Sequence, residues 1–394
     1  MTATALDVLR ALYAHTRRHG LPPPAALIGD WWGADAVIAP SIEIRAGLTP
    51  DAGADRFWLG YCGFGGPRAT AAMLPPGAGG VTAHLLVLRE GRWDTVSVDG
   101  SAPPGWVVDA VAGASATLPT GAAWATTWVA PDHDHHLAAI EKCLDAIRAG
   151  EIYQACVCTR FTGRLDGDPI DFYHDVAATT RPAKSAFLQG DWGAMTSFSP
   201  ESFLRRTGNI VTSSPIKGTI PADADPGLLS ASTKDIAENV MIVDLVRNDL
   251  GRVAVTGSVR VTDLLEVVAA PGVWHLVSTV QAIVGPDLLN TRLLDATWPP
   301  ASVTGTPKIR AAALLEEWEA HPRGAYCGAV GLAGPDGLLD LSVAIRTVEI
   351  SPAGRLELGV GGGITIDSIP EREWQECLDK AASIVGARAL TRDR

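Results

Sequence analysis

The sequence has few cysteines and no long apolar run, and each absence argues against a class of protein. Its 394 residues include six cysteines, none in a Cys-x-x-Cys pair, which fits reduced buried thiols better than a disulfide framework or a zinc site. No apolar run reaches the ~18 residues of a membrane-spanning helix. Met1 to Leu21 also lack the apolar segment and small-residue cleavage site of a signal peptide. We therefore expect a cytoplasmic protein without a membrane partner.

The charge balance is acidic. Lysine and arginine total 32 against 44 aspartates and glutamates, which gives a formal net charge of −12. No run of about five or more basic residues occurs, so nucleic acid is disfavoured as a partner. An anionic small molecule remains compatible with this charge, because local cations, a metal and backbone N–H groups determine the potential of a pocket.

The chain is long enough for one large or two medium domains with a substantial core. Residues 1–130 are rich in Ala, Gly, Pro and Trp, and short strand-like runs such as 57–61 stand between glycine turns. They carry no catalytic motif. We predict an N-terminal supporting subdomain over 1–130, a linker-like stretch at 122–131 and a catalytic domain over 131–394.

A single lysine marks the most distinctive short stretch, Ser213 to Thr219, whose sequence is SSPIKGT. The stretch is typical of a strand end that opens into a tight loop, because Pro215 fixes its own φ and Gly218 tolerates φ values that other residues resist. Lys217 is therefore predicted on a shaped loop. Two interpretations stand: a solvated loop lysine, or a nucleophile, which requires the amine to lose its proton.

Two glutamates flank this stretch along the chain. Glu201 lies in a turn and, taken alone, is an ordinary loop carboxylate. Residues 232–248 have the periodicity of a helix, on which Glu238 shares an apolar stripe with Ile242 and Leu245. A carboxylate on such a stripe either faces water at its edge or, if buried, is paired, protonated or bound to a metal.

The C-terminal part combines a glycine run with a charged helix. Gly361 to Gly363 end a predicted strand, where the backbone can approach a ligand and offer N–H groups to an anion. Ser368 to Glu371 is predicted as a capping box that opens a helix with proline in its first turn. On that helix Glu373, Glu376 and Lys380 share one face, which is either a solvated ion-paired face or part of a site.

Three further polar residues lie in apolar surroundings. His275 lies in a strand-like run after a Pro-Gly turn, where a core histidine and a catalytic histidine both fit. Tyr326 and Arg346 lie in the apolar runs 325–331 and 339–348. These two runs are predicted to be neighbouring strands.

Ten short motifs follow one another in an order that resembles the chorismate-utilising enzymes. The likeness extends from about residue 135 to residue 388. The motifs are EIYQ, SPESF, PIKGT, AENVMIVDLVRNDLGRV, HLVSTV, TGTPKIRA, RGAYCGAVG, AIRT, GGGIT and EREWQECLDK. PIKGT, with Lys217, resembles the variant of the aminodeoxychorismate synthases, whereas anthranilate synthases usually have alanine there. The water-using isochorismate and salicylate synthases usually have a lysine where this chain has Ala155.

The resemblance implies both a fold and a reaction. The implied fold is α+β, with two large, mostly antiparallel sheets packed as a sandwich, helices outside and an active site in a cleft at one side. The implied reaction is the Mg²⁺-dependent amination of chorismate at C4 to 4-amino-4-deoxychorismate, in the pathway to 4-aminobenzoate. Lys217 is expected to attack C2 while Glu201 protonates the departing C4 hydroxyl, and ammonia then adds at C4 and expels the lysine.

The resemblance also implies the other site residues. Glu238 and Glu376, with Glu373, match magnesium ligands, and carboxylates suit that hard cation. His275 matches a histidine close to the substrate ring and is expected among the catalytic residues. The residues expected to hold the substrate, including its two carboxylates, are Tyr326, Arg346, Gly361, Gly362, Gly363, Lys380 and Thr304.

Ammonia is expected from a separate glutamine amidotransferase subunit or from solution, because no glutaminase motif is found in the chain. Two features depart from the family pattern: the N-terminal third lacks the usual tryptophan-pocket motif, and TGTPK has threonine where alanine is usual. Two alternatives stay open. One is an anthranilate or 2-amino-2-deoxyisochorismate synthase, in which Lys217 would be unexplained. The other is an inactive chorismate-binding scaffold, against which the retained Lys217, Glu201, Glu238 and Glu376 argue.

Overall fold

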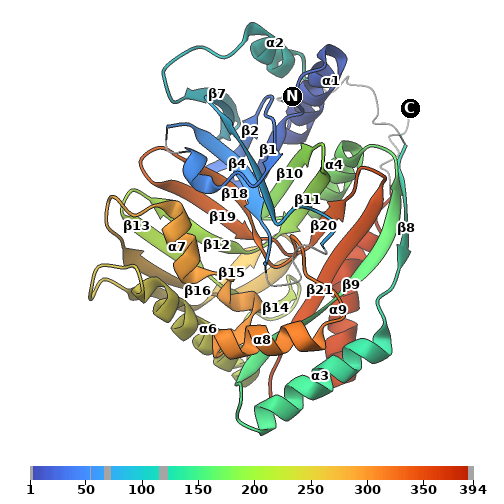
Figure 1. Cartoon of the computed structure of the whole chain (residues 1–394), viewed down its shortest axis with the longest axis vertical. Helices are drawn as coiled ribbons and strands as arrows, with labels where there is room; N and C mark the ends of the chain where they lie inside the picture. The colour runs from blue at the N-terminus through green and yellow to red at the C-terminus, as the bar shows by residue number, and fades with distance from the viewer. Residues whose placement is uncertain (1–2, 54, 66–71, 115–122, 389–394) are drawn as a thin grey trace.

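The protein consists of two antiparallel sheets covered by helices (Figure 1). The computed structural model describes residues 3–53, 55–65, 72–114 and 123–388. One sheet has 11 strands and the other has 10. This confirms the predicted α+β fold with two large, mostly antiparallel sheets. Among the described residues, no helix is both long and apolar enough to cross a membrane.

The larger sheet joins strands from both ends of the chain. Its order is β17 (Gly305–Thr306), β9 (Gln154–Asp166), β21 (Arg355–Ile364), β20 (Thr347–Ile350), β11 (Gly193–Ser199), β10 (Lys184–Gly190), β1 (Ala25–Trp31), β2 (Ala34–Ala39), β6 (His84–Arg89) and β7 (Arg92–Ser97). An eleventh strand, β8 (Ala125–Val129), pairs with β9. Half of the stretch predicted as a linker is therefore a strand, because alternate residues of 125–129 turn inward against the sheet. Residue 122 lies outside the described residues.

The smaller sheet also joins strands that are distant along the chain. Its order is β14 (Ile216–Pro221), β16 (Val273–Ile283), β13 (Ile210–Ser214), β12 (Ser202–Thr207), β19 (Leu338–Val343), β18 (Ala329–Gly334), β4 (Phe57–Cys62), β5 (Gly77–Thr82) and β3 (Arg45–Ala46). The tenth strand, β15 (Arg260–Ala270), pairs with β16. Strands from before residue 130 thus pair with later strands in both sheets: β1 with β10, and β4 with β18. The division of the chain at residue 130 stays a prediction.

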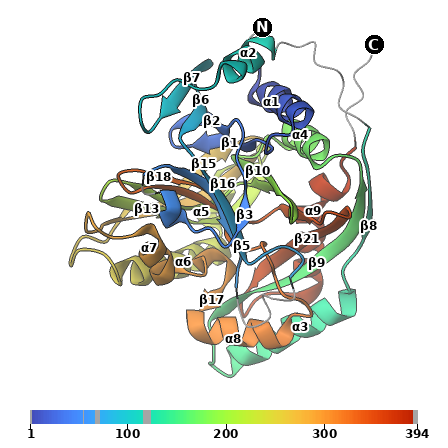
Figure 2. The same ribbon diagram turned by 45° about the horizontal axis from the view of Figure 1, so that its top comes forward.

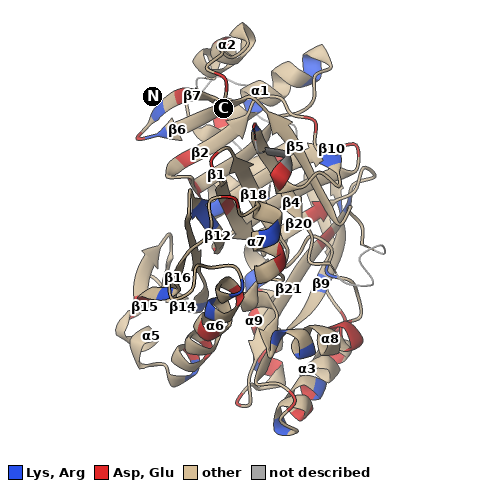
Figure 3. Cartoon of the chain, turned by 60° about the vertical axis from the view of Figure 1, so that its left-hand side comes forward, with Lys and Arg blue, Asp and Glu red and all other residues tan. Residues whose placement is uncertain are grey.

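The helices cover the outer faces and the ends of the sheets. They are α1 (Ala5–His19), α2 (Gly105–Gly113), α3 (His133–Arg148), α4 (Pro169–Thr180), α5 (Gly227–Ala231), α6 (Thr233–Gly251), α7 (Asn290–Thr297), α8 (Lys308–Trp318) and α9 (Pro370–Val385), with short 3₁₀ turns η1 (Pro50–Gly53) and η3 (Ala301–Val303). Figure 2 shows α1, α2 and α4 grouped at the end of the molecule away from α3 and α8. Acidic and basic residues both occur along α3 and α6 (Figure 3).

The core has three main layers of apolar contacts. One lies between the sheets and includes Leu27 and Leu188 of the larger sheet with Leu59 and Leu332 of the smaller sheet. A second packs α1, α4 and α9 against the larger sheet, and a third packs α6 and α7 against the smaller sheet. The sandwich therefore fixes the relative positions of β9, β14, β16 and β21, the strands that carry the candidate site.

Candidate active site

Lys217 lies on an edge strand at a bulge, and the prediction of a loop is wrong. In the pairing of β14 with β16, Ile216 faces Val277 and Thr219 faces His275, so Lys217 and Gly218 together oppose one residue. Gly218 has a φ of +81°, the left-handed conformation that such a bulge favours. The bulge re-aims the lysine, and its Nζ donates a hydrogen bond to the carbonyl oxygen of Ser302 at 3.0 Å.

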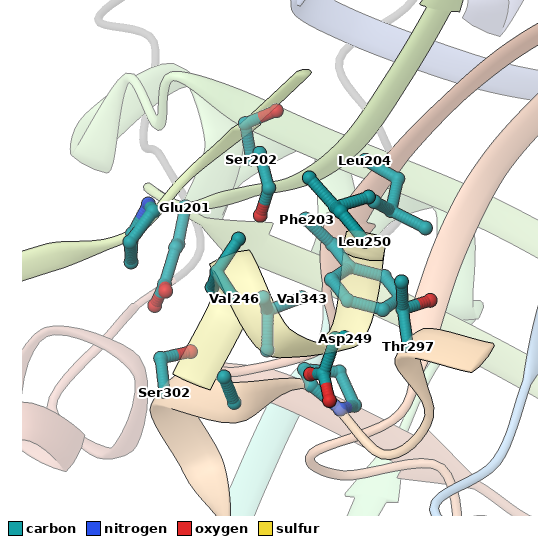
Figure 4. Close-up of a pocket in the computed structure, with 14 residues that line it drawn as sticks. Glu201, Ser202, Phe203, Leu204, Val246, Asp249, Leu250, Thr297, Ser302 and Val343 are labelled. Atoms are coloured by element: carbon teal, nitrogen blue, oxygen red, sulfur yellow. The ribbon is translucent and has the colours of Figure 1, made fainter. Parts of the chain in front are cut away.

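Glu201 lies beside this lysine with its carboxyl group buried. Its backbone carbonyl accepts hydrogen bonds from the Val343 amide and the Ser342 hydroxyl, which fix the turn. Burial raises the pKa of Glu201, although Lys217 and a hydrogen bond from Ser302 partly oppose the rise. Figure 4 shows the carboxyl group pointing toward Ser302. A buried carboxyl with a raised pKa is suited to act as a general acid.

His275 and Arg346 approach each other from different elements. His275 is buried on β16, and its Nδ1 lies 2.8 Å from the Thr219 hydroxyl. Burial lowers its pKa, and the nearby Arg346 lowers it further, so the ring is neutral at pH 7. The ring therefore lies between the bulged strand and a cation.

Arg346 lies in the connection between β19 and β20, not in a strand. The predicted run 339–348 is interrupted because the chain passes there from the smaller sheet to the larger sheet, and Arg346 adopts a φ of +50°. Burial lowers the pKa of its guanidinium, while Glu201 and Tyr326 oppose that effect. In the described part of the chain no hydrogen bond or ion pair engages this guanidinium. It is therefore available for a bidentate contact with a carboxylate.

Tyr326 lies in the turn before β18, so its predicted place in a strand is also wrong. Its ring packs on Gly359, where an added Cβ would lie 2.2 Å from two ring carbons. Its hydroxyl is 3.9 Å from the Cys158 sulfur, within reach of a weak S–H hydrogen bond. Gly359 was not predicted as a site residue. The glycine run was visible in the sequence, but only the packing of the ring shows why this position has no side chain.

The glycine run lies on the part of β21 that extends beyond its neighbour β20. β20 pairs with β21 only as far as Leu358, whereas β9 continues alongside Gly361, Gly362 and Gly363. Because N–H groups alternate between the two sides of a strand, some of those in this run point away from β9. The Lys380 ammonium donates to the Gly361 carbonyl at 2.8 Å, which places this cation beside the run.

Three glutamates also lie close to these glycines. An added Cβ at Gly362 would lie 3.2 Å from a Glu373 oxygen, and one at Gly363 would lie 3.6 Å from a Glu238 oxygen. The Glu376 carboxylate accepts a hydrogen bond from Lys380 at 2.7 Å. We call Glu238, Glu373 and Glu376 the acidic cluster.

The members of the acidic cluster differ in their partners. Burial raises the pKa of Glu238, and its Oε1 is buried without a hydrogen bond. Burial also acts on Glu376, but Lys380, with Lys234 and Lys217, keeps its pKa below the usual value. Lys234 was not predicted: its Nζ lies 3.3 Å from Glu373 and 3.9 Å from Glu238. Its only signal in the sequence is its position four residues before Glu238.

The start of α9 also differs from the prediction. Ile369, not Ser368, is the N-cap residue, so the predicted capping box is wrong, although proline does occupy the first turn. The Ser368 hydroxyl instead accepts a hydrogen bond from the Thr365 amide and donates to Glu373 at 2.7 Å. Ser368 therefore orients a member of the acidic cluster.

The acidic cluster fits a hard divalent cation in its chemistry. Carboxylate oxygens are the ligands that Mg²⁺ prefers, and the buried Glu238 Oε1 accepts no hydrogen bond, with the Lys234 ammonium 3.9 Å away. As the side chains stand, no three His, Cys, Asp or Glu groups of the described residues are close enough to hold a metal ion. Lys234 and Lys380 each engage one oxygen of Glu373 and of Glu376, so a cation would bind the second oxygen of each carboxylate or displace the ammonium groups.

Thr304 contributes to the turn before α8. Its hydroxyl donates to the Pro300 carbonyl at 2.7 Å, and its own carbonyl accepts from the Cys156 amide at 2.8 Å. Ser302, two residues earlier, contacts both Lys217 and Glu201 and was not predicted as a site residue. Nothing in the sequence distinguishes this serine, because its role depends on strands that are distant along the chain.

Lys217 connects these groups electrostatically. Its positive charge lowers the pKa values of Glu201, Glu238 and Glu376 relative to what burial alone would produce. An amine, a protonatable acid and the acidic cluster thus share one site, with the free guanidinium of Arg346 beside the acid. The site can bind a substrate with carboxylates and carry out nucleophilic and acid–base chemistry on it.

Known proteins resemble this chain in sequence and in fold. It is 42% identical to aminodeoxychorismate synthase component 1 of Salmonella typhimurium, over 61% of this chain and 54% of that protein. The corresponding protein of Klebsiella aerogenes is 39% identical, over 79% of this chain and 70% of that protein. The chain therefore spans about half to two thirds of the length of these relatives.

A solved structure shows the same architecture. Anthranilate synthase component I from Streptococcus pneumoniae matches with a TM-score of 0.70 and 26% identity, over 86% of this chain and 83% of that chain. The family model described as chorismate binding enzyme matches residues 110–386, which include every residue of the site described above. The chain therefore belongs to the family of chorismate-binding enzymes.

Proposed function

We propose that the protein aminates chorismate at C4 and releases 4-amino-4-deoxychorismate, as expected of an aminodeoxychorismate synthase component 1. The observation that carries this proposal is the position of Lys217, whose amine lies beside the buried Glu201 carboxyl. The relatives from Salmonella typhimurium and Klebsiella aerogenes, which bear that name, support the choice of reaction.

The proposed reaction proceeds by two displacements. In the first, Lys217 gives its ammonium proton to solvent, its amine forms a bond to C2 of the ring, both ring double bonds shift, and the C4 hydroxyl leaves with a proton from Glu201 as water. In the second, ammonia bonds to C4, both double bonds shift back, and the bond from C2 to Lys217 breaks. Lys217 leaves as a free amine, and the nitrogen added at C4 gives a proton to the Glu201 carboxylate, which restores the acid. Splitting the substitution in this way replaces one difficult step with two easier ones.

The other residues bind and orient the substrate. Arg346, the Tyr326 hydroxyl and the outward N–H groups of Gly361 to Gly363 would hold its carboxylates, with Lys380 close to the same backbone. The neutral imidazole of His275 would lie near the ring of the bound substrate. Glu238 and Glu376, with Glu373, would hold Mg²⁺, which supplies a positive charge for the ring carboxylate and for electron density that moves as the hydroxyl leaves.

Ammonia is proposed to come from a glutamine amidotransferase subunit. The name component 1 of the relatives supports such a partner. The pathway to 4-aminobenzoate and a location in the cytoplasm are part of the same proposal. An anthranilate synthase, the activity named for the Streptococcus pneumoniae protein, is the competing assignment. The presence of Lys217 favours amination at C4 over anthranilate synthesis, because direct attack of ammonia at C2 needs no amine at that position.

Product analysis tests the assignment. The purified protein is incubated with chorismate, Mg²⁺ and an ammonium salt, and the product is identified by mass and ultraviolet spectrum. We expect 4-amino-4-deoxychorismate. Accumulation of anthranilate, which fluoresces, would assign the protein to the competing reaction. Unchanged chorismate would favour the binding scaffold.

A further inference from the structure

Lys308 is buried at the start of α8, and each of its three N–H donors has an acceptor. Its Nζ donates to Asp249 at 2.5 Å, to the Thr297 carbonyl at 2.9 Å and to the Pro299 carbonyl at 2.7 Å. The side chains of Lys308 and Asp249 are 12% and 7% exposed. Because an ammonium has three donors, this lysine is fully satisfied and has no donor left for a substrate.

The three acceptors belong to two different elements. Asp249 lies in the last turn of α6, the helix that carries Glu238 about three turns earlier. Thr297 is the last residue of α7, and Pro299 lies between α7 and η3. Lys308 therefore ties the helix of the acidic cluster to the segment that leads to Ser302. We call Lys308, Asp249 and the two carbonyls the ammonium clamp.

Ser302 carries the effect of the ammonium clamp to the reacting groups. It follows Pro299 by three residues, its carbonyl accepts the Lys217 hydrogen bond, and its hydroxyl hydrogen-bonds to Glu201. A shift of this segment would move the acceptor of the amine and the donor to the acid together. The amine and the acid are thus oriented through one residue.

Packing around Ser302 does not replace the ammonium clamp. Figure 4 shows a narrow pocket between Glu201 and Asp249, with Ser302 and Thr297 in its wall. The rest of the wall is largely apolar, including Val246, Leu250 and Val343. Apolar walls set spacing but give no direction to a hydroxyl or a carbonyl. Directional contacts on this segment come from Lys308 before Ser302, together with Arg323, which donates to the Val303 carbonyl, and Thr304, which donates to the Pro300 carbonyl.

The geometry points to Lys308 as a positioning residue that sets the orientation of Lys217 and Glu201 through Ser302. This inference rests on the proposed function for its effect on turnover. The chemical reactivity of Lys217 can be measured without turnover, so the two can be tested separately. A displacement of about 1 Å in a reacting group can reduce a rate about a hundredfold, so loss of the ammonium clamp should be visible in kcat.

The test uses Lys308→Met and the double variant Lys308→Met/Asp249→Leu. The single variant leaves the Asp249 carboxylate buried without its partner and is expected to be destabilised. The double variant removes both charges with apolar side chains of similar volume, so it is expected to fold. The matched control is Lys184→Met, since Lys184 is another buried lysine, 2.7 Å from Asp340, that lies away from the site.

In both clamp variants we expect kcat per folded molecule to fall at least about tenfold, while KM for chorismate changes less than about threefold, because Arg346 and the glycine run are on other elements. The rate of reductive methylation of Lys217 by formaldehyde, followed by peptide mass, should change at least about threefold, with exposed Lys142 unchanged. Lys184→Met should retain kcat and methylation of Lys217.

Wild-type kcat and wild-type methylation of Lys217 in the folded double variant would overturn the inference. If the wild-type enzyme makes no 4-amino-4-deoxychorismate, the proposed function fails. The methylation rates then decide the positioning role alone: a change in the double variant but not in Lys184→Met supports it, and equal rates overturn it.

Discussion

The Lys217 ammonium donates to the carbonyl of Ser302 at 3.0 Å and, among the described residues, forms no ion pair within 4 Å with any carboxylate. Its positive charge nevertheless acts to lower the pKa values of three carboxyl groups, those of Glu201, Glu238 and Glu376. A carbonyl is a neutral acceptor, so it orients the amine without a carboxylate in contact. The lysine is held in place and remains available to an incoming substrate.

Replacement of Lys217 by alanine should abolish amination and leave the fold intact. The side chain is only partly buried on an edge strand, so its removal opens no core cavity. We expect kcat to fall at least about a hundredfold, the scale for loss of a nucleophile or general base. With wild-type protein and no ammonia, a chorismate-derived adduct on Lys217 should appear in the intact mass. An alanine variant with near-normal turnover would reduce Lys217 to a positioning group.

Glu201 should link activity to pH. Its raised pKa means that the acid form persists to higher pH, and kcat should fall as pH rises through that pKa. Glu201→Gln should lower kcat about a hundredfold or more and remove this limb of the profile. An unchanged basic limb in the glutamine variant would show that another group is the acid.

Glu201→Gln, which is expected to lower kcat, should raise the stability of the fold at high pH. A carboxyl with a raised pKa in the folded state binds its proton more tightly there than in the unfolded state, so ionisation destabilises the fold as pH rises through the folded pKa. Glu201→Gln should therefore gain unfolding free energy relative to wild type at pH 8 but not at pH 4, as measured by urea denaturation. An equal difference at both values would contradict this.

Loss of one acidic-cluster carboxylate should weaken Mg²⁺ binding. For Glu376→Gln we expect affinity, measured by calorimetry, to fall at least about tenfold, since even residues outside the first ligand shell have effects of that size. Glu371→Gln is the matched control, because Glu371 lies on the same helix with an exposed side chain. Full activity of the wild-type protein in excess chelator would exclude a role for the metal.

The nitrogen source should be ammonia when the chain is purified alone. We expect turnover with ammonium chloride at pH 8 and none with glutamine, because no glutaminase motif is found in the sequence. Product formation should therefore rise with pH at constant total ammonium, as the free base becomes more abundant, until loss of the Glu201 proton opposes it. Turnover with glutamine in a preparation free of any amidotransferase would refute the separate-subunit assignment.

Gly359→Ala should displace Tyr326. The added Cβ would lie 2.2 Å from the ring, closer than packing permits, so either the ring or the strand must move. We expect a loss of about 1–3 kcal/mol in unfolding free energy and weaker chorismate binding. The control is Gly113→Ala, where an added Cβ meets nothing within 4 Å. Wild-type KM in the Gly359 variant would remove Tyr326 from the substrate site.

Periodicity and turn chemistry predict much of the local structure. The helix predicted over residues 232–248 is confirmed, and Ser232 caps it by accepting a hydrogen bond from the Asp235 amide. The two-sheet fold came from family resemblance, not from periodicity. Strand partners that are distant along the chain leave no local signal.

Errors concentrate where the chain changes sheets. Arg346 is preceded and followed by apolar residues, so a single strand was predicted, but the two halves of that run belong to different sheets. Lys217 was predicted in a loop because Pro215 and Gly218 surround it, whereas the pairing with β16 turns the glycine into a bulge position. Ser302, Lys234 and Lys308 gain their roles only from contacts made across elements, which spacing along the chain does not encode.

The pairing of β4 with β18 has a consequence for synthesis on the ribosome. β4 is made early, but its partner β18 emerges only after most of the chain, so the smaller sheet cannot close during most of translation. Until then β4 and β5 present an unpaired edge, which is a template for aggregation. A fragment that begins at residue 131 would have the complementary defect, with β10 and β18 each lacking a neighbour. Chaperone dependence and slow folding are therefore expected of the whole chain, because its sheets join segments separated by long stretches of sequence.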